Sequence, residues 1–236
     1  MGVVMAGGAA RAAGVVYSND FETNTNGFDR TETFALPSTG NPATPLSTFL
    51  GRFGNDTATL SLSGLTAGRA YEVRFDLFIG ATWDGNYPGW GGPDVFRLTA
   101  GATPLVDATF GHSPAPGDPL LLQSYSDATP LGGPAYAAAY PGRTGADVDY
   151  FSPNTIFENY SIYYFGHGAG NPYLTFIASG ATETLTFQGL NLQGVGDEFW
   201  AIDNVAVSAV PEPSSIALSL IGLAAAGLYG RRRARG

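Results

Sequence analysis

Acidic residues near both ends of the chain could hold a calcium ion. Asp20 and Glu22 stand close to the beginning of the chain, and Asp203 stands close to its end. Calcium binds roughly six to eight oxygen ligands at about 2.4 Å. If the first and last strands are neighbours in the fold, these three residues converge, and we expect a structural calcium ion there. In the alternative interpretation, Asp203 and Asn204 form only a local hydrogen bond or a turn.

A second group of candidate residues shares the loop 83–94, which also contains several glycines. The acidic and amide side chains of Asp84, Asn86 and Asp94 are a second candidate for a metal site. Exposed aromatic rings on a loop can also stack on the faces of neutral sugars, so an extracellular polysaccharide is the alternative ligand of this loop. The predicted ligand-binding residues are Trp83, Asp84, Asn86, Tyr87 and Trp90, and Asp94 closes the loop. Two plainer interpretations stay open, because Asn, Asp and Gly commonly form turns and Trp83 could cap the core at the end of its strand.

No arrangement of residues in the sequence identifies a catalytic site. The chain has two histidines, His112 and His167, and it lacks the G-x-S-x-G motif that anchors one class of hydrolase. A glycosidase needs only two carboxylates at a defined separation, but nothing in the sequence selects a pair. We therefore predict no catalytic residues and a non-enzymatic protein.

The composition excludes several classes of function. The chain contains no Cys and no Lys, so disulfide bonds and thiolate chemistry are ruled out. Between Val15 and Val210 there are 6 Arg against 19 Asp and Glu, which gives a net charge of −13. Because binding to phosphates requires a basic surface, we expect no nucleic-acid partner. A calcium ion or a neutral glycan suits this acidic surface better.

Hydrophobic and polar residues alternate along most of the chain, which is typical of half-buried β-strands. The longest alternating set is Tyr71, Val73, Phe75, Leu77 and Ile79. Further strands are predicted at residues 57–62, 95–100, 105–110, 160–165, 173–178, 182–190 and 199–207. Short strands at this spacing, separated by Gly, Asn and Pro, predict an all-β fold. We expect an antiparallel, jelly-roll-like β-sandwich over residues 15–209.

Residues 210–236 combine three features of a tail directed to a membrane. The first is the motif Pro211, Glu212 and Pro213, whose residues suit the N-terminus of a helix. Residues 216–230 are uncharged and mostly Leu, Ile, Ala and Gly, so a helix of this sequence can enter a bilayer. The third is a membrane stop that should stay cytoplasmic, formed by Arg231, Arg232, Arg233 and Arg235. We expect one C-terminal transmembrane helix; the alternative is a buried C-terminal helix of a soluble domain.

This order of Pro-Glu-Pro, apolar helix and terminal arginines resembles the PEP-CTERM sorting signal of Gram-negative envelope proteins. The resemblance covers Val210 to Gly236 and implies that an exosortase-type membrane protease acts near Pro211, Glu212 and Pro213. Cleavage there would release or re-anchor the ectodomain, so the inner membrane is a transient or permanent partner. The implied location is the cell envelope outside the cytoplasmic membrane, and the surface or the extracellular space after processing.

The ectodomain resembles a group of uncharacterised secreted bacterial domains that often precede PEP-CTERM tails. The segments that carry this resemblance are Ser18 to Glu22, Phe49 to Phe53, Phe75 to Asn86, Gly92 to Phe96, Gln123 to Tyr125 and Asp197 to Val205. The opening Asp-Phe-Glu and the closing Ile-Asp-Asn-Val also look like jelly-roll carbohydrate-binding modules. In those modules the first and last strands often hold a structural calcium ion. The resemblance implies export and a β-sandwich, and it implies no activity.

Two segments depart from the strand pattern. Residues 1–14 are rich in Ala and Gly, and Ala10-Arg11-Ala12 resembles a cleavage site. We interpret residues 1–14 as the remnant of a signal peptide, or otherwise as a disordered leader. Residues 111–147 are rich in Pro and Gly and are long for a loop within a compact domain. Their tyrosines have surface to bury, which favours a folded excursion over a mobile flap.

These features predict an exported, non-enzymatic surface or extracellular-matrix protein that is sorted through its tail and associated with exopolysaccharide or biofilm. The first alternative is a glycan-binding module with its site in the loop 83–94, and the second is a secreted hydrolase. Exposed aromatic rings in a groove would favour the first alternative. Two convergent carboxylates in a deep cleft would favour the second.

Overall fold

The computed structural model describes residues 14–35, 47–87, 89, 91–112, 121–137, 140–151, 158–167 and 174–211. Residues 15–209 form one compact unit. No helix within these described ranges is long and apolar enough to cross a membrane. The predicted transmembrane helix, the membrane stop and nearly all of the predicted leader lie outside the described residues.

The described part of the chain consists mainly of β-strands. In chain order the elements are β1 (Val15–Asn19), β2 (Thr33–Ala35), β3 (Thr48–Phe53), β4 (Thr57–Ser63), β5 (Ala70–Ala81), β6 (Val95–Ala100), β7 (Thr103–Thr109), β8 (Leu122–Gln123), the short 3-10 helix η2 (Pro134–Tyr136), β9 (Tyr140–Pro141), β10 (Val148–Tyr150), β11 (Tyr160–Phe165), β12 (Leu174–Ile177), β13 (Thr182–Leu190) and β14 (Glu198–Ala209). The predicted all-β fold is confirmed, and strands are present at each of the predicted positions.

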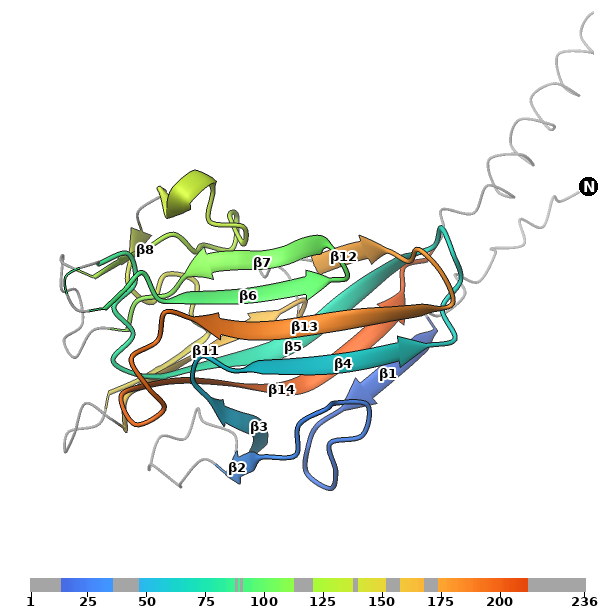
Figure 1. The fold of residues 1–236 in the computed structure, drawn as a ribbon, viewed down its shortest axis with the longest axis horizontal. Coiled ribbons are helices and arrows are strands. Elements are labelled where there is room, and N and C mark those ends of the chain that lie inside the picture. The colour runs from blue at the N-terminus through green and yellow to red at the C-terminus, as the bar shows by residue number, and fades with distance from the viewer. Residues whose placement is uncertain are drawn as a thin grey trace, which may run out of the picture. The chain divides into compact units, whose positions relative to one another are not determined.

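Two large antiparallel sheets face each other as two layers (Figure 1). The larger sheet has the order β10-β11-β5-β14-β3-β2, with β1 also paired to β14 and β12 also paired to β5. The smaller sheet has the order β4-β13-β6-β7, and β8 pairs with β9 separately. The first and last strands are therefore neighbours, with Asn19 opposite Val205. This arrangement agrees with a β-sandwich, while the jelly-roll assignment stays a prediction.

The main core lies between the two sheets, because every second side chain of a strand points to the same face. In β5 the inward set is the predicted one, and Tyr71, Val73, Phe75, Leu77 and Ile79 are all buried. The ring of Phe75 packs against Phe96 of β6 and Phe187 of β13, with centroids 6.2 and 5.4 Å away. Each fully buried ring contributes about 1.5–3 kcal/mol relative to an exposed one.

A second hydrophobic cluster covers the opposite face of the larger sheet. Its buried members are Phe49, Phe78, Ala81, Val148, Tyr160, Ile162, Phe199 and Ala201. The ring of Phe78 stacks on Tyr160 and Phe199, with centroids 5.0 and 5.5 Å away. The central strands β5 and β14 are thus buried on both faces over much of their length. Packing on both faces holds the side chains at the ends of these strands in defined positions.

The described residues of the predicted excursion 111–147 are packed against the sandwich. Tyr125 is buried, and its ring stacks on Phe110 at 4.6 Å and meets Tyr163 edge to face at 5.2 Å. The hydroxyl of Tyr136 donates a hydrogen bond to Asp107 of β7 at 2.9 Å. Burial of Tyr125 and the hydrogen bond of Tyr136 thus hold the described part of the excursion against the sandwich.

Candidate functional site

Three carboxylates from distant parts of the sequence meet in the interior of the unit. We call Asp84, Asp94 and Glu198 the acidic cluster. Asp84 follows β5, Asp94 precedes β6, and Glu198 is the first residue of β14. One carboxylate oxygen of each residue lies within 4.8 Å of the others. The exposed fractions are 5% for Asp84 and 0% for Asp94 and Glu198, so the cluster is closed to solvent.

The local sequence after β5 explains how Asp84 reaches the interior. The backbone N–H of Thr82 donates to the carbonyl oxygen of Asp197 at 3.1 Å, and its hydroxyl donates to the Asp197 carboxylate at 2.6 Å. The next residue, Trp83, is fully buried and donates its indole N–H to the carbonyl oxygen of Phe199 at 3.0 Å. These contacts fasten the end of β5 to the start of β14 and place Asp84 beside Glu198.

Backbone groups hold the other two carboxylates in place. The N–H of Asp94 donates to the carbonyl oxygen of Gly85 at 3.0 Å, and the Asp94 carboxylate accepts the N–H of Asp84 in return. Gly85 has a φ of 63°, and a β-carbon there would collide with the carbonyl oxygen of Leu122, so the loop requires glycine. Glu198 accepts the backbone N–H of Gln193 at 2.6 Å.

The acidic cluster is not neutralised by the protein groups around it. None of the ion pairs found in the described ranges includes a cluster carboxylate. The side chain of Gln193 donates to Asp84 Oδ2 at 3.2 Å. However, Asp94 Oδ1 and Glu198 Oε1 are buried and have no hydrogen-bond partner. A buried carboxylate oxygen without a donor is costly, so this arrangement requires either a proton or a cation.

The electrostatics of the acidic cluster follow from this burial. Burial raises the pKa of Asp84 to about 6, and the charge of Asp197 adds to the increase. Burial, followed by repulsion from Glu198 and Asp84, raises the pKa of Asp94 far above that of an ordinary aspartate. Burial also raises the pKa of Glu198, against the opposing effect of the Gln193 N–H. Three such groups cannot all be charged near neutral pH without a positive partner.

The predicted calcium ligands near the chain ends are brought together in part. The Ser47 hydroxyl contacts both the Asp203 carboxylate and, at 3.2 Å, Glu22 Oε1. Glu22 also accepts the N–H and hydroxyl of Thr48 at 2.7 and 3.0 Å. Asp20 instead accepts the N–H of Glu22 at 3.3 Å. Among the described residues, the acidic cluster alone has three carboxylates at metal-ligand spacing, so Asp20, Glu22 and Asp203 do not form such a group.

Hydrogen bonds satisfy the carboxylate of Asp203, and its local bond to Asn204 matches the plainer interpretation of these residues. The N–H of Asn204 donates to Asp203 Oδ1 at 2.6 Å. Burial raises the pKa of Asp203 to about 7, although the donors Ser47 and Asn204 oppose this increase. The backbone N–H of Thr48 lowers the pKa of Glu22. We refer to Glu22, Ser47 and Asp203 as the serine-bridged network.

The loop 83–94 does not present the predicted rings to a sugar. Trp83 has an exposed fraction of 0%, so the prediction that it stacks on a ligand is wrong, and its ring caps the core instead. Asn86 donates to the carbonyl oxygen of Tyr136 at 3.1 Å and accepts the Thr109 hydroxyl, which ties the loop to the excursion. Tyr87 is half-buried. Trp90 lies outside the described residues.

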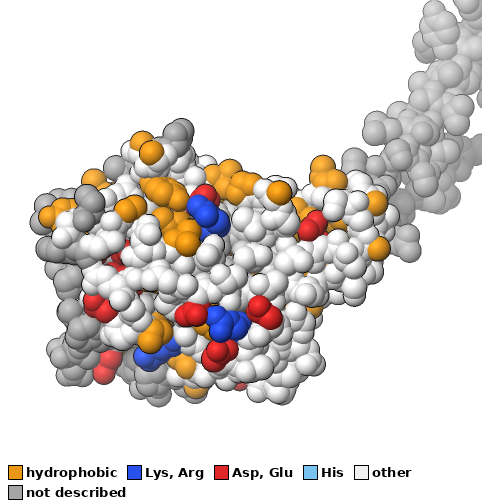
Figure 2. All heavy atoms as spheres, viewed as in Figure 1, with side chains coloured by type: hydrophobic (Ala, Val, Ile, Leu, Met, Phe, Trp, Pro, Cys, Tyr) orange, Lys and Arg blue, Asp and Glu red, His pale blue; other side chains and the backbone are white. Residues whose placement is uncertain are grey.

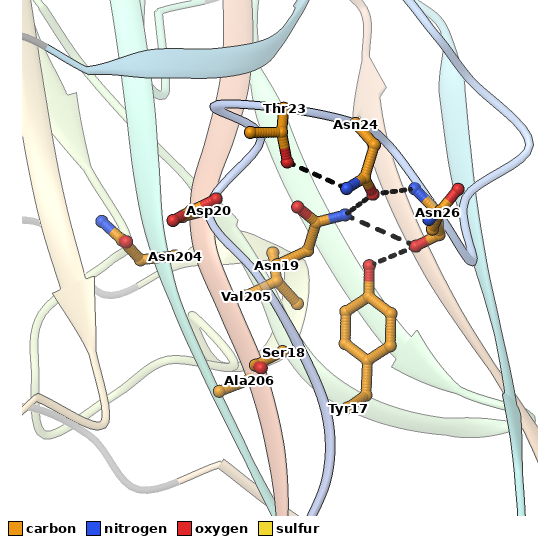
Figure 3. Close-up of a pocket in the computed structure, with 10 residues that line it drawn as sticks. All are labelled: Tyr17, Ser18, Asn19, Asp20, Thr23, Asn24, Asn26, Asn204, Val205 and Ala206. Carbon is orange, nitrogen blue, oxygen red and sulfur yellow. Dashed lines mark hydrogen bonds between the residues drawn. The ribbon is translucent and has the colours of Figure 1, made fainter.

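A polar pocket of about 430 Å³ lies beside β1 and the middle of β14 (Figure 3). Its lining consists of Tyr17, Ser18, Asn19, Asp20, Thr23, Asn24, Asn26, Asn204, Val205 and Ala206. Asn19 Nδ2 donates to Asn24 Oδ1 at 3.3 Å, and the Tyr17 hydroxyl donates to the Asn26 carbonyl oxygen at 2.7 Å. We call this feature the Asn-rich pocket. Its amides and hydroxyls suit an uncharged polar ligand better than an ion.

Two residues of these sites were not predicted from the sequence. Glu198 lies far along the chain from Asp84 and Asp94, and only the pairing of β14 with β5 brings them together. The signal that could have identified Glu198 is its position: it is a glutamate at the first residue of a strand whose two faces are both buried. Ser47 carries no comparable signal, because an isolated serine between predicted strands is most simply interpreted as part of a turn.

No curated protein matches this chain. Two similar solved structures are the insecticidal delta-endotoxin Cry8Ea1 from Bacillus thuringiensis and a family GH115 4-O-methyl-alpha-glucuronidase with specificity for decorated arabinogalactans. They are both 14% identical, with TM-scores of 0.31 and 0.34, and cover 66% and 77% of this chain. This chain spans only 18% and 16% of their lengths.

The end of the chain has a specific match. Residues 209–233 match the PEP-CTERM protein-sorting motif. The motif marks a secreted protein that is associated with the cell envelope and processed by exosortase, which is a membrane protein. Of the predicted sorting residues, Pro211 is exposed two residues after the end of β14, while Glu212 and Pro213 lie outside the described residues.

Proposed function

We propose that this chain is a non-enzymatic protein of the cell surface or extracellular matrix, associated with exopolysaccharide or biofilm. The observation that carries the proposal is the sorting motif at residues 209–233, which begins at the last residue of β14. A compact β-domain that is followed by such a motif suits a protein that is exported across the inner membrane. The domain would then act outside the cell as a stable, acidic building block.

The placement of the acidic groups supports a non-enzymatic role. A glycosidase needs two carboxyl groups about 5–9.5 Å apart on either side of an open site. The acidic cluster is buried, which leaves no room for a sugar between its carboxylates. The Asn-rich pocket is open but contains one carboxylate, Asp20, among neutral groups. Neither place combines an accessible cleft with a pair of carboxylates, so a secreted hydrolase is the less favoured alternative.

The distribution of charge supports a polysaccharide partner over nucleic acid. In the view of Figure 2, basic side chains lie beside acidic ones and do not gather into a basic patch. Arg30 pairs with Glu32 and Asp56, and Arg97 pairs with Asp107 at 3.2 Å. Because these arginines are paired with carboxylates, they offer little free positive charge to bind phosphates.

The experiment that tests this proposal follows the protein in cells with and without the sorting protease. With the protease present, we expect a mature protein in the surface or matrix fraction, with an intact mass that corresponds to cleavage near Pro211. Without the protease, the full-length chain should stay in the inner-membrane fraction. The variant Glu212→Ala should behave as if the protease were absent. Accumulation of the domain in the cytosol would contradict the proposal.

The alternative function is glycan binding, and the Asn-rich pocket favours it. The pocket is large enough for one or two sugar rings, and amide and hydroxyl groups are the usual partners of sugar hydroxyls. We expect that a glycan array probed with the protein gives signals that Asn24→Ala reduces by about tenfold, the equivalent of one or two hydrogen bonds. The exposed residue Thr66, outside the pocket, provides the control variant Thr66→Ala. An empty array, or equal signals from both variants, would exclude this function.

A further inference from the structure

We propose that Asp84, Asp94 and Glu198 bind a calcium ion that joins the loop after β5, the loop before β6 and the start of β14. This site differs from the one predicted at Asp20, Glu22 and Asp203, and it does not depend on the proposed function. The structure brings together three chain segments here, and each contributes one carboxylate.

The spacing of the carboxylates fits one ion. Calcium binds oxygen at about 2.3–2.6 Å, so two oxygens on the same ion are at most about 5 Å apart. The three carboxylate oxygens of the acidic cluster all lie within 4.8 Å of one another. A single ion can therefore contact all three without rearrangement of the strands that carry them.

Two unpartnered oxygens provide an independent reason to place an ion here. Asp94 Oδ1 and Glu198 Oε1 are buried and accept no hydrogen bond, although their side chains are fully enclosed. In the serine-bridged network, by contrast, protein donors reach the buried carboxylate of Asp203. The missing element at the acidic cluster is a positive partner, and a divalent ion would neutralise two of the three charges.

The donor atoms indicate calcium among the common metal ions. The cluster offers only carboxylate oxygens, which are hard ligands, whereas zinc favours His and Cys. Calcium also accepts irregular geometry and amide or carbonyl oxygens, while magnesium requires a nearly ideal octahedron. The Gln193 amide is next to Asp84, and a half-turn of this amide would present its oxygen in place of its nitrogen.

The competing explanation is a proton shared between Asp94 and Glu198. The two carboxyl groups are close enough for one to donate to the other when it is protonated. In that case the cluster is a closed hydrogen-bonded pair and calcium has no effect on it. The two explanations differ in the response to calcium, because only the ion site predicts that calcium stabilises the protein.

The test compares the full chain, purified in detergent and stripped with EDTA, with and without calcium chloride. We expect millimolar calcium to raise the melting temperature by about 5 °C, and magnesium to raise it much less. The double variant Asp94→Asn, Glu198→Gln should lose this response. The control variant Glu22→Gln, Asp203→Asn should keep the calcium response.

Several results would overturn the proposal. One is a wild-type protein with no calcium-dependent shift and no heat in calorimetric titration with calcium. A second is a calcium response that disappears in the control variant and persists in the cluster variant. A third is a calcium-dependent shift of equal size in the wild type and in the cluster variant.

Terbium luminescence keeps the test decisive if the cluster variant does not fold. Trp83 is the residue directly before Asp84. Terbium bound at the acidic cluster should therefore receive energy from the indole of Trp83 and emit when tryptophan is excited. Calcium should displace it. At saturating terbium, the variant Trp83→Phe should still reduce the emission several-fold, although the loss of its indole bond to the Phe199 carbonyl oxygen should also weaken calcium binding. Emission that is unchanged by Trp83→Phe would place the ion elsewhere.

Discussion

The acidic cluster and the serine-bridged network each include a carboxylate from β14, but the hydrogen-bond partners of the two carboxylates differ. Glu198 and Asp203 are about 16 Å apart along the strand and point to opposite faces, since side chains alternate. Asp203 accepts hydrogen bonds from Ser47 and from the N–H of Asn204, which stands at a bulge with φ 51°. Glu198 faces two other carboxylates and keeps one oxygen without a partner.

This difference shows that burial of an acidic residue does not by itself indicate a ligand. At Asp203 the surrounding chain supplies hydrogen-bond donors, so the carboxylate is satisfied within the protein. At the acidic cluster the chain supplies mainly further acceptors, so the carboxylates are satisfied only when a proton or a cation is bound. Three variants test this difference between the acidic cluster and the serine-bridged network.

Trp83→Ala should have the largest effect, because Trp83 anchors the loop that carries Asp84. Truncation of a buried tryptophan typically costs about 3–5 kcal/mol of unfolding free energy. We also expect calcium affinity to fall at least tenfold, since the loop loses its bond to Phe199. Urea unfolding and calorimetric titration measure the two effects. Phe165→Ala, a core truncation on β11, is the control and should lower stability without changing calcium affinity.

Ser47→Ala should have a smaller effect that is confined to the other region. It removes a donor from the buried carboxylate of Asp203, which should cost about 1–3 kcal/mol of unfolding free energy. The cost should be largest at pH 8, because the pKa of Asp203 is about 7 and the carboxylate is charged there. Calcium affinity should stay unchanged. Ser61→Ala, on the exposed side of β4, is the control, and an equal loss in both variants would contradict the assigned role of Ser47.

Much of the fold could be predicted from the sequence, because strand alternation is a local property. The set from Tyr71 to Ile79 shows this, since each hydrophobic residue is buried as its position predicts. The neighbouring first and last strands were also expected, and they bring Glu22 and Asp203 to one hydroxyl. The order of Pro-Glu-Pro, apolar run and terminal arginines resembles a sorting signal, and the match to the sorting motif at residues 209–233 confirms that resemblance.

The candidate site could be predicted only in part, because it depends on contacts between distant segments. The sequence places Asp84 and Asp94 in one candidate metal loop, but Asn and Asp beside Gly are more simply interpreted as turns, and the aromatic rings of the loop indicate sugar binding. The burial of Trp83 reverses that interpretation, and local sequence does not reveal whether a tryptophan at the end of a strand points inward or outward. Glu198 joins the cluster through the register of β14 against β5, in which Glu198 is opposite Ala81.

His167→Gln should have the smallest effect, and it tests the charge balance beside the serine-bridged network. Asn204 donates to Asp76 at 2.8 Å, and His167 Nε2 lies 3.0 Å from the other oxygen of Asp76. The hydrogen bond to Asp76 raises the pKa of His167, with a smaller contribution from Asp147 and opposition from burial and from Arg74.

A histidine whose pKa is higher in the folded state stabilises the fold when it is protonated. Its contribution should be complete below about pH 6.5, the unfolded pKa, and should disappear as the pH rises through the folded pKa. We therefore expect wild type to exceed His167→Gln by up to about 1 kcal/mol of unfolding free energy at pH 5.5, because the pair is partly exposed and screened. The difference should vanish at pH 8.5. Urea unfolding at both pH values measures it, and a difference independent of pH would show that His167 acts by packing and not by charge.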